Sequence, residues 1–167
     1  GIDIDTRAKQ LAIFALMLKA CQRDSSLIDA SLMPRVYDMS EMPEESRVLG
    51  SVQIFNDAEN QNPVIAALST KYDAIVMNPP YMSTGSVGLL KAYTAKYYPD
   101  SKSDLSSVFM DVCYNRLKEG GRYSMINMQS WMFLSSFEKL RKRIIKEQEI
   151  ESMLHLLSLI PGTPLFL

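Results

Sequence analysis

Four consecutive residues in this chain have the types and spacing that suit chemistry: Asn78, Pro79, Pro80 and Tyr81. They follow an apolar run at 72–77 that is typical of a buried strand. Two adjacent prolines fix φ and remove two backbone donors, so the chain leaves the strand in a rigid turn whose carbonyl oxygens can accept hydrogen bonds. Asn78 adds a side-chain carbonyl, and Tyr81 adds a flat aromatic face with a polar tip. The turn can therefore hold an amino group and stack on the ring that carries it, as in a nucleobase.

A strand followed by Asn-Pro-Pro-Tyr resembles the catalytic motif of amino-group methyltransferases that use S-adenosylmethionine, most often on adenine. A bare Pro-Pro turn would be an ordinary strand ending, but the full tetrapeptide at this place favours the functional interpretation. The resemblance extends over most of the chain. It is closest to the N6-adenine-specific DNA methyltransferases of type IIG-like restriction-modification and phage-defence systems. It implies an enzyme that transfers a methyl group from S-adenosylmethionine to the exocyclic amino group of adenine in DNA.

The same resemblance implies residues that bind the cofactor. The family's acidic residue after the second strand contacts the ribose, and Asp3 matches it, while Ile4 would pack on the cofactor's adenine. The acidic residue after the third strand contacts the adenine amino group, and Asp57 matches it. Ala58 would offer its backbone N–H to the same ring, and Phe109 would pack on it. The alternatives are an ordinary Asx turn at Asp57 and an ordinary core position for Phe109.

The amino nitrogen of adenine is a poor nucleophile because its lone pair is delocalised into the ring. The Asn78 side-chain carbonyl and the Pro79 backbone carbonyl would hold both amino hydrogens and direct the lone pair at the methyl sulfonium. A base inside a duplex cannot reach such a turn, so the mechanism implies a flipped adenine that stacks on Tyr81. Methyltransferases that act on ribosomal RNA adenine or on a protein glutamine amide share the turn and remain alternatives. The long loop at 82–103, followed by Asp-Leu at 104–105, favours DNA.

No stretch of the chain matches the family's glycine-rich loop, which holds the methionine end of the cofactor, or its target-recognition region. We therefore interpret residues 1–167 as part of a catalytic domain that is incomplete at the N-terminus. The flipped adenine is the expected contact with DNA, and the recognition contacts are expected elsewhere. We expect the isolated chain to be inactive, and a folded but catalytically silent fragment is a further alternative.

The composition limits the class of protein. With 167 residues, of which 47% are hydrophobic and 22% charged, the chain can form about one domain. A net charge of −1 does not mark a nucleic-acid binder, so a separate recognition region would carry the phosphate contacts. Two cysteines and one histidine argue against a disulfide framework and a metal site. We expect a cytoplasmic protein, because no apolar run suits a membrane span and no signal pattern is present.

The elements that must position these residues alternate between strands and helices. Strands are expected at 2–4, 51–55, 72–77, 122–128 and 150–157. Helices are expected at 6–22, 63–69, 104–117 and 134–146, with a short one at 89–97 inside the loop and an irregular connection at 23–50. Gly120 and Gly121 are expected to end the helix before them. This alternation predicts an α/β fold with a doubly wound, mostly parallel, Rossmann-like sheet of the class I methyltransferase type.

Overall fold

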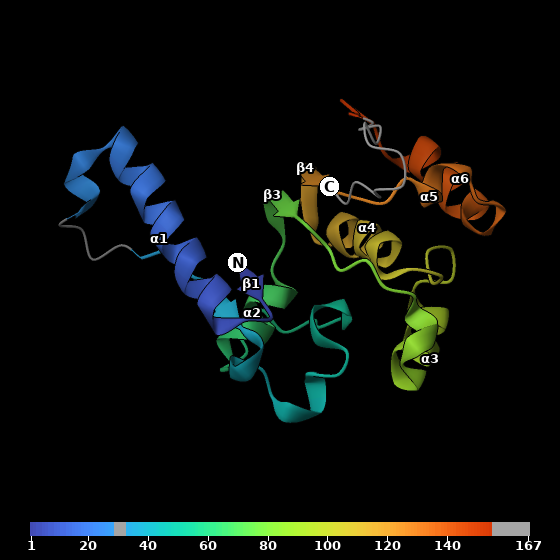
Figure 1. Cartoon of the computed structure of the whole chain (residues 1–167), viewed down its shortest axis with the longest axis horizontal. Coiled ribbons are helices and arrows are strands. Elements are labelled where there is room, and N and C mark those ends of the chain that lie inside the picture. Colours follow the sequence, from blue (N-terminus) through green and yellow to red (C-terminus); the bar gives the residue numbers. More distant parts are fainter. Residues whose placement is uncertain (29–32, 155–167) are drawn as a thin grey trace, which may run out of the picture. The chain divides into compact units, whose positions relative to one another are not determined.

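The computed structural model describes residues 1–28 and 33–154 (Figure 1). The chain divides into two compact units, Gly1–Thr70 and Lys71–Leu167, and each unit contains a two-stranded sheet. The strands are β1 (Ile2–Asp3) and β2 (Tyr37–Asp38) in the first unit, and β3 (Tyr72–Met77) and β4 (Leu117–Met125) in the second. Both pairs are parallel. The described fold is therefore α/β, as expected, with small parallel sheets.

Helices follow the strands in both units. The α-helices are α1 (Thr6–Arg23), α2 (Pro63–Ser69), α3 (Gly88–Tyr97), α4 (Leu105–Asn115), α5 (Ser130–Phe133) and α6 (Glu138–Glu147). Short 3-10 helices lie between them: η1 (Ser25–Ile28), η2 (Met39–Glu41), η3 (Glu44–Ser46), η4 (Gly50–Val52), η5 (Thr84–Ser86) and η6 (Ser135–Phe137). Among the described residues, no helix combines the length and apolar character that crossing a membrane requires.

In the first unit, side-chain caps fix where the helices begin. The Asp5 carboxylate accepts a hydrogen bond from the Arg7 N–H at 2.7 Å and starts α1 directly after β1. Asn62 caps α2 in the same way, and Pro63 occupies its first helical position, where no N–H is needed. A small core forms where α2 packs against the segment after β2, with Met42, Val64 and Leu68 buried.

In the second unit, helix α4 is the centre of the core. Asp104 caps it by accepting from the Ser106 N–H at 2.8 Å, and every residue from Leu105 to Cys113 is buried. A hydrophobic cluster joins α4 to α6 and the turn before it; its buried members are Met110, Phe137, Leu140 and Ile144. Met125 of β4 packs against this cluster, whereas Val76 of β3 is 85% exposed. One face of the β3–β4 sheet therefore packs on the helices, and the other is open.

Several expected elements differ from the structure. The strand expected at 51–55 does not form, because η4 occupies the first two of these positions and the rest are irregular. Strand β2 was missed inside the expected irregular connection. The helix expected from 134 begins as α6 only at Glu138, after η6. Residues 150–154 form no strand, and 155–157 lie outside the described residues.

The expectation that Gly120 and Gly121 end a helix was wrong. Helix α4 ends at Asn115, and both glycines lie inside β4, where the pairing with β3 is irregular. Gly120 has a φ of +70°, which favours glycine. A Cβ on Gly121 would lie 3.0 Å from the Lys118 carbonyl oxygen and 3.1 Å from that of Tyr72. The glycine pair therefore allows the two strands to approach closely at their irregular start.

Candidate active site at the end of strand β3

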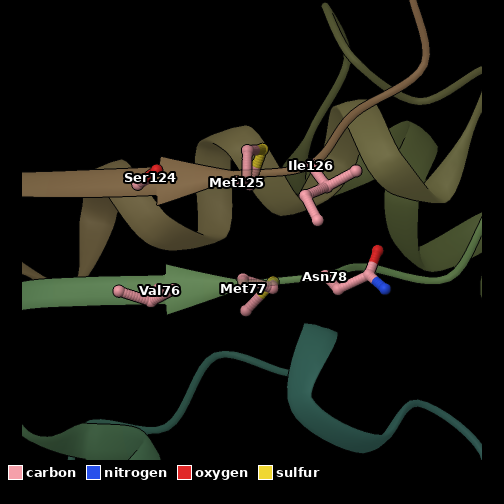
Figure 2. Close-up of a pocket in the computed structure, with 6 residues that line it drawn as sticks. All are labelled: Val76, Met77, Asn78, Ser124, Met125 and Ile126. Atoms are coloured by element: carbon pink, nitrogen blue, oxygen red, sulfur yellow. The ribbon is translucent and has the colours of Figure 1, made fainter. Parts of the chain in front are cut away.

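The Asn-Pro-Pro-Tyr turn leaves the sheet at the C-terminal end of β3, as expected. Asn78 is exposed immediately after the strand (Figure 2). Pro79 is buried, which anchors the turn. Because β3 and β4 are parallel, their C-terminal ends lie at the same edge of the sheet. Met77 pairs with Met125 at this edge, and the Ile126 N–H donates to the Met77 carbonyl at 3.2 Å.

The Tyr81 hydroxyl lies close to two oxygen acceptors. It donates to Asn78 Oδ1 at 2.6 Å, and it lies 3.1 Å from the Ile126 carbonyl oxygen. Burial raises the pKa of Tyr81 above its ordinary value, so the phenol stays protonated at neutral pH. The structure therefore brings Asn78 and Tyr81 into direct contact and adds the end of β4 to the site.

A cavity of about 230 Å³ opens between the ends of the two strands. Its lining residues are Val76, Met77, Asn78, Ser124, Met125 and Ile126, all drawn in Figure 2. Most of the lining is apolar, and Asn78 is one of its polar residues. Its volume lies below the roughly 300–1,000 Å³ of pockets that enclose a drug-sized ligand, and the site is open to solvent.

The chain beyond the turn is fastened to the start of α4. The Met82 carbonyl accepts from the Leu105 N–H at 2.9 Å, and Ser83 forms an antiparallel bridge with Asp104. The Thr84 hydroxyl donates to the Lys102 carbonyl. The expected loop at 82–103 is thus closed at its base, and the short helix expected inside it is confirmed as α3.

The structure places Phe109 within α4, where its side chain is only 5% exposed. Every residue from 105 to 113 is buried, so this position belongs to the core of the second unit. A contact between Phe109 and a cofactor stays a prediction. The sequence could not distinguish a core role from a cofactor contact, because an aromatic residue on the buried face of a helix is suited to both.

Asp3, Ile4, Asp57 and Ala58 belong to the first unit and are described within it. Asp3 ends β1, is half-buried and accepts from the Asp5 N–H at 3.0 Å, while Ile4 is 85% exposed beside it. Asp57 does not follow a strand. It is exposed, its carboxylate accepts from Asn60 Nδ2 at 2.9 Å, and Ala58 lies in the turn that this contact closes. The local geometry at Asp57 is therefore a side-chain-stabilised turn.

Sequence reasoning missed a carboxylate and a carbonyl. Asp38 ends β2 directly opposite Asp3 in the parallel register, and its side chain is buried. Its Oδ1 accepts from the Ser40 hydroxyl and from the Ser40 N–H, the latter at 2.9 Å, and Lys9 Nζ lies 3.5 Å from its Oδ2. These contacts hold the pKa of Asp38 below its ordinary value, and the hydrogen bond from the Ser40 hydroxyl is the main cause. The apolar residue Val36 before Tyr37 was the one sequence signal for a strand that ends at Asp38. No sequence signal pointed to the Ile126 carbonyl, because every residue type has a backbone carbonyl.

Comparisons with known proteins agree with the motif. Residues 1–159 match the Eco57I restriction-modification methylase family, and the chain belongs to this family. The resemblance to adenine-specific methyltransferases of restriction-modification systems is thereby confirmed.

Three relatives illustrate the match. The chain is 39% identical over 144 residues to the adenine-specific methyltransferase BrxX of Escherichia coli O9:H4 (strain HS), which covers 84% of the chain and 11% of that protein. It is 31% identical over 217 residues to the adenine-specific methyltransferase PglX of Lacticaseibacillus casei (strain Zhang), which covers 93% of the chain and 18% of that protein. It is 29% identical over 93 residues to the type II methyltransferase M.PstI of Providencia stuartii, which covers 56% of the chain and 18% of that protein. The chain thus spans less than a fifth of the length of these relatives.

Proposed function

We propose that this chain is part of the catalytic domain of a DNA methyltransferase that transfers a methyl group from S-adenosylmethionine to the exocyclic amino group of adenine. The observation that carries the proposal is that Asn78 directly follows β3 at its C-terminal end and lines the cavity at this edge of the sheet. Two relatives named adenine-specific methyltransferases favour adenine over a glutamine amide. The restriction-modification description of the matched family favours DNA over RNA.

In the proposed reaction the turn binds the amino group by accepting its hydrogens. Asn78 Oδ1 accepts one and the Pro79 carbonyl accepts the other, which leaves the nitrogen lone pair facing outward. This arrangement stabilises the transition state by position and electrostatics and needs no covalent intermediate with the protein. Tyr81 supplies the aromatic face for a base flipped out of the duplex.

The residues of the first unit fit the adenosine part of S-adenosylmethionine. The Asp3 carboxylate at the end of β1 suits ribose hydroxyls, and the exposed side chain of Ile4 beside it suits the face of a purine. Asp57 and Ala58, in an exposed turn of the same unit, would contact the adenine amino group and ring edge. When bound, S-adenosylmethionine supplies the methyl sulfonium that the amine attacks. Among the described residues, no group of three or more His, Cys, Asp or Glu side chains could hold a metal ion.

The finer architecture is part of the same proposal. We infer that the parallel strands of both units belong to a doubly wound, Rossmann-like sheet of the class I methyltransferase type. Parallel pairing in each unit and the helices that follow the strands support this inference. Residues 1–167 would be one part of that catalytic domain, with target recognition in another part of the protein. The enzyme would act in the cytoplasm, where bacterial DNA is accessible.

The test is to express the complete open reading frame that encodes this chain and to incubate the protein with DNA and labelled S-adenosylmethionine. We expect N6-methyladenine among the nucleosides released from the DNA, identified by mass spectrometry. Matched incubations with ribosomal RNA and with protein acceptors test the alternatives. A label that enters RNA or protein and not DNA would assign the turn to a different substrate.

A further inference from the structure

We propose that α3 presents an aromatic platform on which a second base of the target DNA stacks once the adenine has left the duplex. The platform is the ring of Tyr97, supported by Tyr93 and bordered by Lys96. This inference rests on the proposed function and deepens it, because it adds a further contact between the protein and its DNA. The base that the platform receives is the former partner or a neighbour of the adenine, since Tyr81 stacks on the adenine itself.

The first step is the packing of three tyrosine rings from the core to the surface. Tyr98 is 3% exposed and belongs to the core of the second unit. The centre of the Tyr93 ring lies 6.4 Å from that of Tyr98 and 4.5 Å from that of Tyr97, which is 43% exposed. The exposed ring is therefore held by the other two, so it loses little conformational freedom when a flat partner stacks on it.

The second step is the attachment of α3 to the second unit. Leu90, Thr94 and Tyr98 follow one another at intervals of four residues, and all three are buried. Residues at this spacing lie along one side of a helix, which fastens α3 along its whole length. Lys96 and Tyr97 lie off this stripe and are exposed. The helix therefore presents the ring of Tyr97 at a fixed place on the surface.

The third step is the charge around the platform. The Lys96 ammonium lies 4.8 Å from the centre of the Tyr97 ring. The one acidic residue of the segment 82–103, Asp100, lies 3.7 Å from Arg143, so its charge is neutralised. Aromatic rings next to cations are typical of sites for unpaired bases, where the ring stacks and the cation meets the phosphate. When a nucleotide binds, the Lys96 ammonium can pair with the phosphate and leave the ring face to the base.

The fourth step is the state of the DNA in the proposed reaction. In an intact duplex both faces of each base are covered by its neighbours, so no base can stack on a tyrosine. Extrusion of the adenine leaves its partner unpaired and uncovers a face of each adjacent base. Residues 82–87 join Tyr81 to α3, so the platform belongs to the segment that directly follows the catalytic turn. Flipping therefore creates the ligand that this segment is suited to bind.

The experiment compares the complete wild-type protein with Tyr97→Ala, which removes the ring, and with Tyr97→Phe, which keeps it. Each protein binds a duplex that contains the adenine that the wild type methylates. Further duplexes have an intact backbone but lack one base, either the partner of this adenine or a base of an adjacent pair. Tyr72→Ala is the control for the loss of an exposed tyrosine, because Tyr72 lies at the end of β3 opposite to the turn.

We expect Tyr97→Ala to bind the complete duplex about tenfold more weakly than the wild type, because one stacked base is lost. Tyr97→Phe and Tyr72→Ala should bind as the wild type does. The salt dependence of binding should be the same for all four proteins, since a stacked ring neutralises no phosphate. In the duplex that lacks the stacked base, Tyr97→Ala and the wild type should bind equally, which identifies that base as the partner or a neighbour.

The platform would be overturned by an unchanged affinity of Tyr97→Ala for the complete duplex, by an equal loss in Tyr97→Phe, or by a reduced salt dependence in Tyr97→Ala. A loss that persists in every duplex that lacks a base would also overturn it. Tyr97→Leu, which has apolar bulk but no flat ring, replaces Tyr97→Ala if circular dichroism shows that variant to be unfolded. A wild type that methylates no adenine in DNA would instead refute the proposed function, so the two failures can be told apart.

Discussion

The side-chain oxygen of Asn78 is the group on which the proposed chemistry depends most. It accepts a hydrogen bond from the Tyr81 hydroxyl at 2.6 Å, and it belongs to an exposed residue that lines the cavity. Because the side chain adds little to the core, its removal should affect the reaction far more than the fold.

We predict that Asn78→Ala slows methyl transfer about 100-fold or more, equivalent to roughly 3 kcal/mol in the barrier, because a positioned acceptor is removed. Single-turnover methylation with saturating DNA measures the effect, and circular dichroism checks the fold. Asn115→Ala, at another exposed asparagine of the second unit, should keep wild-type rates. Normal turnover in Asn78→Ala would show that the turn is not catalytic.

A second prediction at the residue scale concerns the two thiols. Cys113 is 1% exposed, and burial raises its pKa to about 11, whereas Cys21 is only half-buried. Because the thiolate is the reactive form, a disulfide reagent at pH 8 should label Cys21 first and Cys113 only after denaturant unfolds α4. The labelling rate of Cys113 in the folded protein should rise as the pH approaches 11. Equal rates for both thiols at pH 8 would contradict the burial of α4.

At the scale of elements, a polar network ties α4 and α6 to the segment that follows α3. Asp111 of α4 is 4% exposed, accepts from the Ser101 hydroxyl at 2.6 Å and also accepts from Arg143 of α6. Arg143 lies 3.7 Å from Asp100 as well. A buried carboxylate is costly unless it is paired and hydrogen-bonded, so the fold depends on these partners.

We predict that Arg143→Ala lowers the free energy of unfolding by about 2 kcal/mol. This is below the roughly 3–5 kcal/mol of a fully buried pair, because the Arg143 side chain is 29% exposed. Lys142→Ala is the matched control: its pair with Glu138 is exposed and should contribute about 0.3–0.5 kcal/mol. Urea unfolding of both variants measures the difference, and equal decreases would show that Asp111 does not need Arg143.

The elements that the sequence predicted well are those with strong local signals. Helices α1, α2 and α4 begin within one residue of the expected starts, and the Asp5, Asn62 and Asp104 side chains cap them. Strand β3 was recognisable from its continuous apolar run, and the turn at its end from two adjacent prolines. Each of these signals lies within a few residues of the structure that it specifies, so a single sequence suffices to find it.

The elements that were predicted badly from the sequence depend on partners that are distant in the chain. Strand β2 contains only Tyr37 and Asp38, and it is a strand because it pairs with β1, far away in the chain. The alternation at 51–55 indicated a strand, but these residues form no strand pair. Gly121 looked like a helix end, and its actual role is to let the backbone of β3 approach within about 3 Å of where its side chain would be. The Ile126 carbonyl lies within hydrogen-bonding distance of the Tyr81 hydroxyl because β3 pairs with β4, and this pairing too could not be predicted from local sequence.

At the scale of the whole molecule, a net charge of −1 conceals a locally basic segment. Residues 82–103 contain Lys91, Lys96 and Lys102, all exposed, and a single acidic residue, Asp100, which lies next to Arg143. The Lys96 ammonium lies 4.8 Å from the centre of the Tyr97 ring, so cations and aromatic faces alternate on α3. This segment follows the catalytic turn and is fastened at its base, which places a positive surface beside the proposed site of base flipping.

The final prediction is that α3 binds the phosphate backbone of DNA. Replacing Lys91 and Lys96 by Ala in the complete protein should weaken DNA binding at low salt. It should also reduce the slope of log K against log salt by about 0.9 for each phosphate that the variant no longer neutralises. Binding titrations from about 50 to 200 mM salt measure the slope, and Lys146→Ala on α6 is the matched control for the removal of an exposed positive charge. If the double variant keeps the wild-type slope, α3 serves as a cover for the turn, and other parts of the protein bind the phosphates.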